Sequence, residues 1–499
     1  MPAPGSGAML PDGGQDSAST ATDSAQSPEL RETHSAVVLL LGEHAYKIKK
    51  RVDLGFLDFL TDASRKQVCQ RELELNRRLA PDVYLDVISI RGATGHDYEQ
   101  GLLMRRMPDR LRLSTMISRG EDVSQHLRAL AQLIATFHAG AERGPEIVAE
   151  AGATGLRRRW TDNLRETESF LGNPLAETLH TQISDLALRY VDGRGALLAE
   201  RAAAGLFVDG HGDLLADDVF CMPDYPRVLD CIEFDDRLRW VDTLDDVCFL
   251  AMDLEHLHRA DLAQHLLDWY VEFSGTAAVR SLQHHYIAYR AFVRAKVSCI
   301  RAGQGSPSAS ADADSYARLA LAHLRAGEPR LVLIGGAPGT GKTTLSRAVV
   351  DDRDWVLLSS DEVRRQLPAD PDDRYSPAAK AATYRELLRR ARHALEHGQC
   401  VIADASWGDV AMRQLAENLA DQTASTLIAL ECRAPVAVTA TRAEHRLAQG
   451  DDASEAGADI ARRLAASRDP WPGAIGIPTD TTPDTSLRAA LTALGPSTQ

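Results

Sequence analysis

The chain has 499 residues, of which 44% are hydrophobic and 25% are charged, and its formal net charge is -15. This composition is typical of a globular protein, and the length suggests about three domain-sized units. The acidic net charge disfavours an overall nucleic-acid-binding surface. The seven cysteines form no C-x-x-C pair, and the sequence shows neither a signal-peptide pattern nor an apolar run long enough to span a membrane. We therefore expect a cytoplasmic protein with reduced thiols and no membrane contact.

Segments of low complexity divide the chain into two predicted folded bodies. Residues 1–28 are rich in Gly, Ser, Asp, Ala and Pro, and such a segment buries too little apolar surface to fold, so we expect disorder. A similar stretch begins near residue 303. We therefore predict domains at 29–302 and 329–495, joined by a linker and connecting helix at 303–328.

The first body opens with strand-like segments near 36–50, followed by a predicted helix at 64–80. In "AYKIKK" the alternation places Lys47 and Lys49 on one face of a strand, where a lysine can pair with nucleotide phosphates. The helix carries Glu72 inside an apolar stripe, and an unpaired charge there would be costly. We predict that Lys47 and Glu72 form a nucleotide clamp, while Lys49 stays open as an alternative to Lys47.

Two acidic segments then follow in the order of a kinase catalytic site. "HGDLLADD", from His211 to Asp218, matches the kinase pattern H-x-D-L-x-x-x-N except that Asp218 stands where a kinase has Asn. Asp230 follows in the strand-like run "RVLDCIEF". We predict Asp213 as a catalytic base and Asp218 and Asp230 as metal ligands, because carboxylates are good oxygen ligands for Mg²⁺.

Near the end of the first body a predicted helix at 288–302 is strongly basic. It carries Arg290, Arg294, Lys296 and Arg301. A basic helix facing the acidic loop could contribute substrate or interdomain contacts, but a solvated helix face is the interpretation that we favour.

The second body alternates short apolar runs with helical patterns. The runs lie at 331–335, 355–359, 400–404 and 426–432. Alternation of this kind predicts a parallel sheet with helices on both faces, the α/β class.

A phosphate-binding loop is the strongest motif in the sequence. "GAPGTGKT" satisfies G-x-x-x-x-G-K-[ST], follows an apolar strand and opens a helix, which is the context that the motif requires. The predicted nucleotide-binding residues are Gly336, Ala337, Pro338, Gly339, Thr340, Gly341, Lys342, Thr343 and Thr344. Lys342 would reach the terminal phosphates of ATP, and the Thr343 hydroxyl would bind Mg²⁺.

Candidate catalytic groups follow at the ends of the next strands. Asp361 could accept a proton from a substrate hydroxyl, and Arg364 could bind phosphate; the alternative is a helix cap beside a solvated arginine. Asp404 ends the next strand, where it would either hold the Mg²⁺ ion or contact the substrate. Arg442 and Arg446 share one helix face, and they form either a lid over the phosphates or part of a surface helix.

At this point the second body resembles the P-loop kinases that phosphorylate small molecules or polynucleotide ends, such as gluconate kinase, zeta toxin and polynucleotide kinase. The resemblance rests on "GAPGTGKTT", on Asp361 with Arg364, on "IADAS" and on the arginine pair, and it covers about 329–478. It implies phosphoryl transfer to a hydroxyl with Asp361 as the base.

The first body resembles the aminoglycoside phosphotransferase-like branch of the protein-kinase fold, an α+β two-lobed domain. That branch usually has H-G-D-L-H-x-x-N and I-D-x-x-E-F where this chain has "HGDLLADD" and "VLDCIEF". Over about 29–478 the chain resembles bacterial two-domain proteins described as aminoglycoside phosphotransferase-like/AAA-family ATP-binding proteins, with "YKIKKRVDLGFLDF" and "LNRRLAPDVYLDV" among the matching stretches. Asp218 and Leu215 depart from the pattern, so catalysis at this site stays open.

Together these features predict a bifunctional phosphotransferase that uses ATP and Mg²⁺ on a small-molecule hydroxyl acceptor such as a sugar or aminosugar. The alternative is a nucleotide-driven regulatory ATPase whose kinase-like domain is a non-catalytic ligand sensor. End phosphorylation of nucleic acid is a third class, which the net charge of -15 disfavours. The sequence names neither the acceptor nor the oligomeric state.

Overall fold

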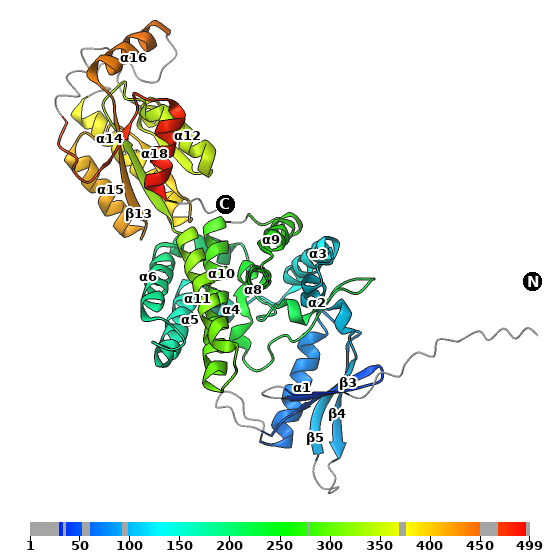
Figure 1. Ribbon diagram of the computed structural model, residues 1–499. Coiled ribbons are helices and arrows are strands. Elements are labelled where there is room, and N and C mark those ends of the chain that lie inside the picture. Colours follow the sequence, from blue (N-terminus) through cyan, green and yellow to red (C-terminus); the bar gives the residue numbers. More distant parts are fainter. Residues whose placement is uncertain are drawn as a thin grey trace, which may run out of the picture. The chain divides into compact units, whose positions relative to one another are not determined.

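The computed structural model describes residues 29–32, 36–51, 60–91, 98–277, 279–368, 376–449 and 468–495 (Figure 1). Residues 1–28, for which we predicted disorder, lie outside the described residues. The chain forms two compact units. The first consists of the residues up to Leu73 with Pro81–Met107, and the second of Glu74–Ala80 with Pro108–Gln499.

The first unit is a five-stranded antiparallel sheet with one helix. Its strands are β1 (Glu29–Glu32), β2 (Ala36–Leu41), β3 (His44–Lys49), β4 (Tyr84–Arg91) and β5 (Tyr98–Arg105), in the order β1-β2-β3-β5-β4. Helix α1 (Asp62–Asn76) belongs to this unit as far as Leu73. Strand β3 is central, and β5 approaches it so closely that a Cβ at Gly101 would lie 2.7 Å from the Lys47 carbonyl oxygen. The sheet therefore fixes the strand that carries Lys47 and Lys49.

The second unit begins with a mostly helical part. Its helices are α2 (Leu113–Ser118), α3 (Ser124–Gly140), α4 (Pro145–Ala151), α5 (Ala153–Thr167), α6 (Glu177–Gly193), α7 (Gly195–Ala203), α8 (Thr243–His256), α9 (Ala260–Ser274), α10 (Arg280–Gly303) and α11 (Ala309–Ala326). Two short antiparallel ladders pair β6 (Phe207–Asp209) with β9 (Trp240–Asp242) and β7 (Val219–Phe220) with β8 (Arg227–Val228). Helix α8 lies at the centre, since every residue from Thr243 to Met252 is buried.

The segment predicted as a linker and connecting helix contributes to this core. Helix α11 begins at Ala309, inside the low-complexity stretch, and packs along α10. Its buried stripe includes Ala313, Tyr316, Ala320 and Leu324, which join the hydrophobic core of the helical part. Small alanines let the two helices approach closely, so a composition that suggests a linker folds here as a helix.

The remainder of the second unit is a parallel sheet between two layers of helices. The strands β10 (Arg330–Gly335), β11 (Val356–Ser359), β12 (Val401–Asp404), β13 (Thr426–Arg433) and β14 (Ile475–Pro478) are arranged as β11-β12-β10-β13-β14. The helices are α12 (Lys342–Arg353), α13 (Ser360–Gln366), α14 (Pro377–Glu396), α15 (Val410–Gln422), α16 (Val436–Gln449) and α18 (Pro483–Leu494). One core lies under α14 and α15 and another under α12 and α18, which confirms the predicted α/β class.

The strand order places the candidate site of this sheet. The chain leaves central β10 toward β11 and later returns to the other side through β13 and β14, so the direction of winding changes next to β10. Open parallel sheets bind ligands at the carboxyl ends of their strands beside such a point. Among the described residues, no helix is long and apolar enough to cross a membrane.

Candidate active sites

The phosphate-binding motif forms the loop between β10 and α12. Three of its glycines have positive φ angles: 148° at Gly336, 85° at Gly339 and 84° at Gly341. A Cβ on Gly339 would lie 2.5 Å from the Thr439 carbonyl oxygen, and one on Gly336 would lie 2.5 Å from Thr340 Oγ1. Both positions therefore exclude larger residues by space as well as by backbone conformation.

Lys342 and Thr343 begin α12 and face the end of β12. Thr343 Oγ1 donates to Asp404 Oδ2 at 2.8 Å, and Lys342 Nζ donates to the Ala337 carbonyl at 3.2 Å. Burial lowers the pKa of Lys342, against the opposing effect of the nearby Asp404 and Asp361 carboxylates. Burial also raises the pKa of Asp404, against Lys342 and the Thr343 hydrogen bond. A partly buried lysine at the start of a helix and beside a glycine-rich loop is suited to bind phosphate.

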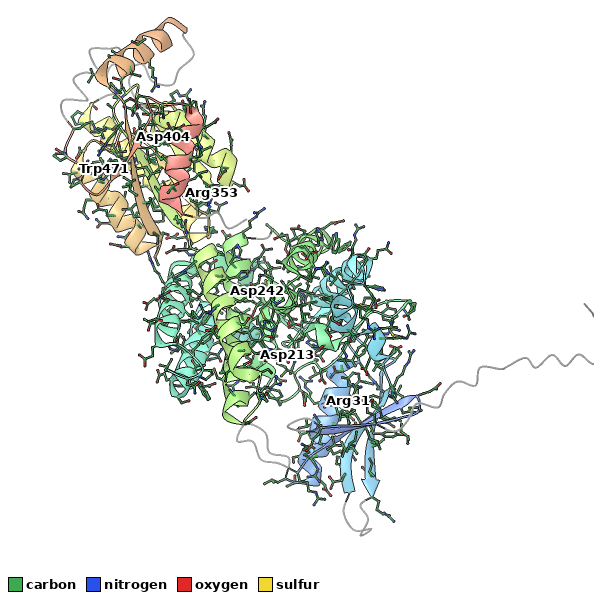
Figure 2. The ribbon with its side chains drawn as sticks, viewed as in Figure 1. Arg31, Asp213, Asp242, Arg353, Asp404 and Trp471 are labelled. Atoms are coloured by element: carbon green, nitrogen blue, oxygen red, sulfur yellow. The ribbon has the colours of Figure 1, made fainter. Side chains whose placement is uncertain are left out.

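Asp361 and Arg364 lie one turn apart in the short helix α13. Arg364 Nη1 is 2.5 Å from Asp361 Oδ1, and both side chains are partly exposed. Asp361 also acts electrostatically on Lys342 and on Asp404. The structure therefore brings Asp361, Lys342 and Asp404 together at the carboxyl ends of β11 and β12. Asp404 is labelled in Figure 2.

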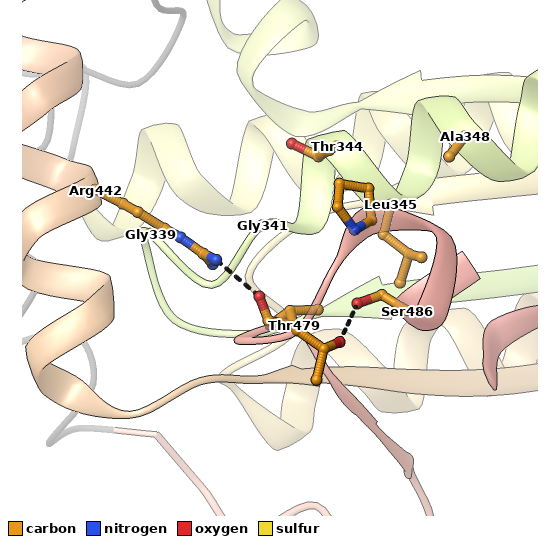
Figure 3. A pocket seen from close by; sticks show the side chains of 10 residues that line it. Gly339, Gly341, Thr344, Leu345, Ala348, Arg442, Thr479 and Ser486 are labelled. Carbon is orange, nitrogen blue, oxygen red and sulfur yellow. Dashed lines mark hydrogen bonds between the residues drawn. The ribbon is translucent and has the colours of Figure 1, made fainter. Parts of the chain in front are cut away.

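A cavity of about 440 Å³ adjoins the phosphate-binding loop (Figure 3). It is lined by Gly339, Gly341, Thr344, Leu345, Ala348, Arg442, Thr479, Thr481, Pro483 and Ser486. Arg442 extends from α16 and donates through Nη2 to the Thr479 carbonyl at 2.9 Å. Arg446 also lies in α16, but its side chain is outside the described residues.

Sequence reasoning missed several of these groups. Thr479 and Thr481 follow β14, a strand that the apolar runs did not reveal. Arg468 was also missed: it donates to the Ser406 carbonyl at 2.8 Å and to Glu431 Oε1 at 3.1 Å, and it acts electrostatically on Lys342. None of these residues belongs to a local motif, so no sequence signal identified them.

In the first unit two lysines share one glutamate. Lys47 Nζ is 2.8 Å from Glu72 Oε1, and Lys49 Nζ is 2.6 Å from Glu72 Oε2. The side chains of Glu72 and Lys49 are each 1% exposed, whereas that of Lys47 is 14% exposed. The structure thus forms the expected ion pair and adds a second one. Both lysines are thereby held in place by the same buried carboxylate.

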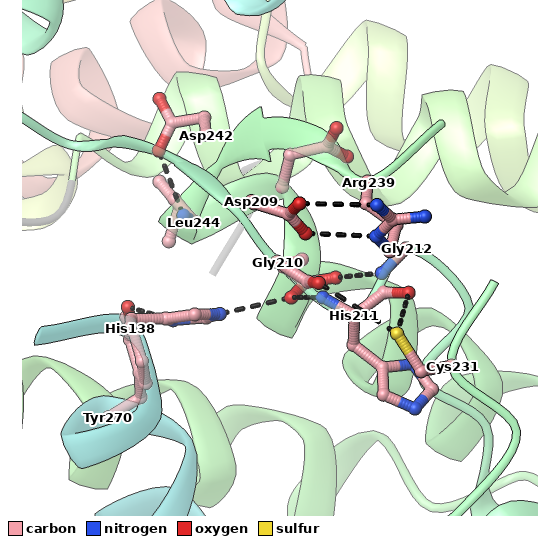
Figure 4. Close-up of polar contacts among 12 residues, drawn as sticks. His138, Asp209, Gly210, His211, Gly212, Cys231, Arg239, Asp242, Leu244 and Tyr270 are labelled. Carbon is pink, nitrogen blue, oxygen red and sulfur yellow. Dashed lines mark hydrogen bonds and ion pairs between the residues drawn. The ribbon is translucent and has the colours of Figure 1, made fainter. Parts of the chain in front are cut away.

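The loop "HGDLLADD" is held through its backbone in the second unit (Figure 4). Asp246 accepts hydrogen bonds from the His211 N–H at 2.7 Å and the Gly212 N–H at 2.8 Å, and it also contacts His138 Nε2 at 3.0 Å. Arg290 Nη1 donates to the Gly212 carbonyl at 2.9 Å. Arg290 is only 5% exposed, so the predicted solvated helix face is wrong for this residue. The loop geometry is therefore over-determined, as a catalytic loop requires.

Asp230 is held beside this loop in an uncommon conformation. Its φ of 63° is left-handed, and strained backbone of this kind is concentrated at functional sites. The flanking residues are anchored, since the Leu229 N–H donates to the Asp218 carbonyl at 2.9 Å and the Cys231 N–H to Asn76 Oδ1 at 3.0 Å. The segments that carry the two predicted metal ligands are thus bonded to each other.

Asp213 lies in the same loop, partly buried. Burial raises the pKa of Asp213 to about 6, with Arg294 and Arg290 acting against the shift and Asp230 and Asp253 acting with it. A carboxylate that titrates close to neutral pH is suited to accept a proton in general-base catalysis.

The candidate protein ligands can hold Mg²⁺ only together with the phosphate oxygens of a bound nucleotide. Among the described residues, no group of three or more His, Cys, Asp or Glu side chains could hold a metal ion. Mg²⁺ is commonly bound by one or two carboxylates together with phosphate oxygens and water. The hydrogen-bonded Thr343 and Asp404 match that pattern.

The class of the C-terminal part is shown by a family match: residues 331–471 match the family described as AAA domain. The Mycobacterium tuberculosis protein Rv2004c is 42% identical over 453 residues, which make up 89% of this chain and 90% of that protein. The chain therefore belongs to the same protein family as Rv2004c.

Solved structures similar to this chain include a gluconokinase and a choline/ethanolamine kinase family protein. A gluconokinase from Sinorhizobium meliloti is 16% identical, covers 33% of this chain and 91% of its own, and has a TM-score of 0.25. A choline/ethanolamine kinase family protein from Mesorhizobium loti is 16% identical, covers 61% of this chain and 94% of its own, and has a TM-score of 0.38. The AAA-domain match and the two-part architecture confirm the resemblance predicted from the sequence.

Proposed function

We propose that the chain is an ATP-dependent phosphotransferase whose P-loop domain phosphorylates a hydroxyl of a small molecule, such as a sugar or aminosugar. The observation that carries this proposal is the grouping of Lys342, Thr343, Asp404 and Asp361 around one phosphate-binding loop, with the Thr343–Asp404 hydrogen bond at 2.8 Å. A simple nucleotide switch needs the loop and the metal ligands, but it does not need a carboxylate placed to accept a substrate proton.

In the proposed reaction the acceptor oxygen forms a bond to the γ-phosphorus while the bond to the β–γ bridging oxygen breaks. Asp361 takes the hydroxyl proton, and Arg364, which pairs with Asp361, binds the phosphoryl oxygens. Bound Mg²⁺ would neutralise phosphate charge beside Thr343 and Asp404. The products are ADP and a phosphate ester, and the proton passes from Asp361 to solvent.

The cavity beside the loop offers space for the nucleoside of ATP. It adjoins Gly341 and Thr344, so a nucleotide whose phosphates occupy the loop would extend into it. Arg442 lies at its edge, where a guanidinium can stack on a base or contact a phosphate. Arg446, one turn further along α16, is proposed as a second lid cation.

The kinase-like domain is proposed as a second phosphotransferase site. Asp213 would be its base, and Asp218 and Asp230 its metal ligands. In the first unit, Lys47 with Glu72 is proposed as a nucleotide clamp. The raised pKa of Asp213 supports this candidate, because perturbed carboxylates are concentrated at functional sites. The competing function is a regulatory ATPase in which this domain binds ligand without turnover.

The test is ATP turnover with Mg²⁺ on the intact chain, on Lys342→Ala, on Asp213→Ala and on the surface control Lys380→Ala. Each form is screened against sugars, aminosugars, aminoglycosides and nucleosides, with product identified by mass spectrometry. A product lost only in Lys342→Ala supports the P-loop kinase, and a different product lost only in Asp213→Ala supports the second site. Ligand binding that alters ATP hydrolysis without any phosphorylated acceptor would favour the regulatory ATPase.

We also propose that the protein acts in the cytoplasm and does not bind nucleic acid. The net charge of -15 supports the second part of this proposal, since nucleic-acid phosphate backbones are bound by clusters of positive charge. Salt-sensitive binding to single-stranded DNA or RNA would contradict it.

A further inference from the structure

The candidate catalytic loop of the kinase-like domain has no cation of its own. "HGDLLADD" contains the carboxylates Asp213, Asp217 and Asp218 but neither lysine nor arginine, and Asp230 adds a fourth carboxylate next to it. Phosphoryl transfer spreads negative charge over the phosphoryl oxygens, and enzymes neutralise that charge with cations placed in advance. A cation from another element would therefore complement the Mg²⁺ ion that the proposed function places at this loop.

Helix α10 reaches this loop with an arginine that is already used. Arg290 forms ion pairs with Asp245 at 2.7 and 3.0 Å while it donates to the Gly212 carbonyl at 2.9 Å. Its charge is thus paired and its side chain is buried. Arg290 fixes the position of the helix against the residue that precedes Asp213.

Arg294 follows one turn later on the same face of α10, since residues four apart are neighbours on a helix surface. It hydrogen-bonds to Tyr316 and acts electrostatically on Asp213 and Asp253. Tyr316 is itself fixed, because its ring stacks on His256 with centroids 3.8 Å apart and planes at 17°. Asp253 accepts the Ala216 N–H at 2.8 Å, which ties it to the same loop.

One donor of this arginine is left over. Among the described residues, the Nε atom of Arg294 is buried without a hydrogen-bond partner, although leaving a buried charged donor unsatisfied is costly. A guanidinium held by Tyr316, which interacts electrostatically with the candidate base and keeps one unpaired donor, has the chemistry to bind an oxyanion.

We propose that Arg294 is a catalytic residue of the kinase-like domain and binds the oxygens of the phosphoryl group during transfer. The proposal rests on the proposed function of this domain, in which Asp213 takes the acceptor proton. The acceptor oxygen bonds to the γ-phosphorus, the bond to the bridging oxygen breaks and ADP leaves. Arg294 offsets the charge that develops on the phosphoryl oxygens and stays protonated throughout.

The test measures binding of ADP, with and without aluminium fluoride, to full-length Lys342→Ala protein in Mg²⁺, where aluminium fluoride imitates the phosphoryl group in transfer. Adding Asp230→Asn to this parent identifies the binding that depends on the carboxylates beside this loop. The test variants are Arg294→Gln and the conservative Arg294→Lys. The control is Arg301→Gln, an exposed arginine in the last turn of α10.

We expect Arg294→Gln to weaken the aluminium fluoride complex by about 10- to 100-fold while ADP alone binds as before. Arg294→Lys should retain part of the affinity for the aluminium fluoride complex, and Arg301→Gln should retain all of it. The proposal is overturned if Arg294→Gln matches Arg301→Gln, or if the parent shows no gain from aluminium fluoride that depends on Asp230. The second result would remove the kinase-like site but leave the P-loop reaction, which is measured separately in the chain that keeps Lys342.

Discussion

Removing Lys49 should loosen the first unit, whereas removing Lys47 should spare it. Lys49 and Glu72 are each 1% exposed and lie 2.6 Å apart, and breaking such a buried pair typically costs about 3–5 kcal/mol. Because Glu72 keeps Lys47 at 2.8 Å, we expect Lys49→Met to cost about 2–3 kcal/mol. Lys47 is partly exposed, and its loss leaves Glu72 paired with Lys49, so Lys47→Met should affect nucleotide binding more than stability.

The assay is native-state hydrogen exchange of the amides in β3 and α1, measured by mass spectrometry on the full chain. A loss of about 2–3 kcal/mol corresponds to exchange that is about 30- to 150-fold faster in Lys49→Met. Lys50→Met is the matched control, because Lys50 pairs with the largely exposed Glu32 and should change exchange little. Equal loss of protection in Lys47→Met and Lys49→Met would refute the assignment of separate roles to the two lysines.

Three further predictions concern the two candidate sites. Asp404→Asn should reduce kcat of the P-loop reaction by about 100-fold or more and raise the Mg²⁺ concentration needed for half-maximal rate, measured by magnesium titration against Thr343→Ser, which keeps the hydroxyl. Activity that depends on Asp213 should fall as pH decreases through about 6, because the raised pKa protonates the base there; a pH–rate profile flat down to pH 5 would contradict this. Gly339→Ala should abolish nucleotide binding by the P-loop domain in calorimetry, since its φ is 85° and a Cβ would lie 2.5 Å from the Thr439 carbonyl; Gly473→Ala, with open space around it, should bind normally.

Local patterns account for the parts that the sequence predicted. The glycine spacing of the P-loop fixes a strand, a loop and a helix at once, so Lys342 and Thr343 follow from the motif alone. The pairing of Lys47 with Glu72 could be predicted because Glu72 lies in an apolar helix stripe and therefore needs a positively charged partner. The alternation of the strand offers Lys47 as that partner. In both cases the physical constraint lies within a few consecutive residues.

The parts that were not predicted depend on contacts between distant segments. Arg294 and Asp213 are 81 positions apart by their residue numbers, and only the packing of α10 against the loop brings them together. Arg468 likewise lies far from Lys342 in the sequence, yet it acts on Lys342 electrostatically in the folded domain. Tyr316 lies beyond a stretch whose composition indicates a linker, and its burial depends on the partner surface of the helical part. Composition and periodicity carry no information about such pairings.

The central claim is that ATP is used to phosphorylate an acceptor, and the most direct measurement is the fate of the γ-phosphate. The intact chain is incubated with γ-labelled ATP, Mg²⁺ and each candidate acceptor, and label in phosphorylated acceptor is compared with label in free phosphate. The account predicts that, with the right acceptor, nearly every ATP consumed yields one phosphate ester, and that Lys342→Ala removes the product of the P-loop domain. Label that ends only in free phosphate, at a rate altered by a ligand that is never phosphorylated, would contradict the claim.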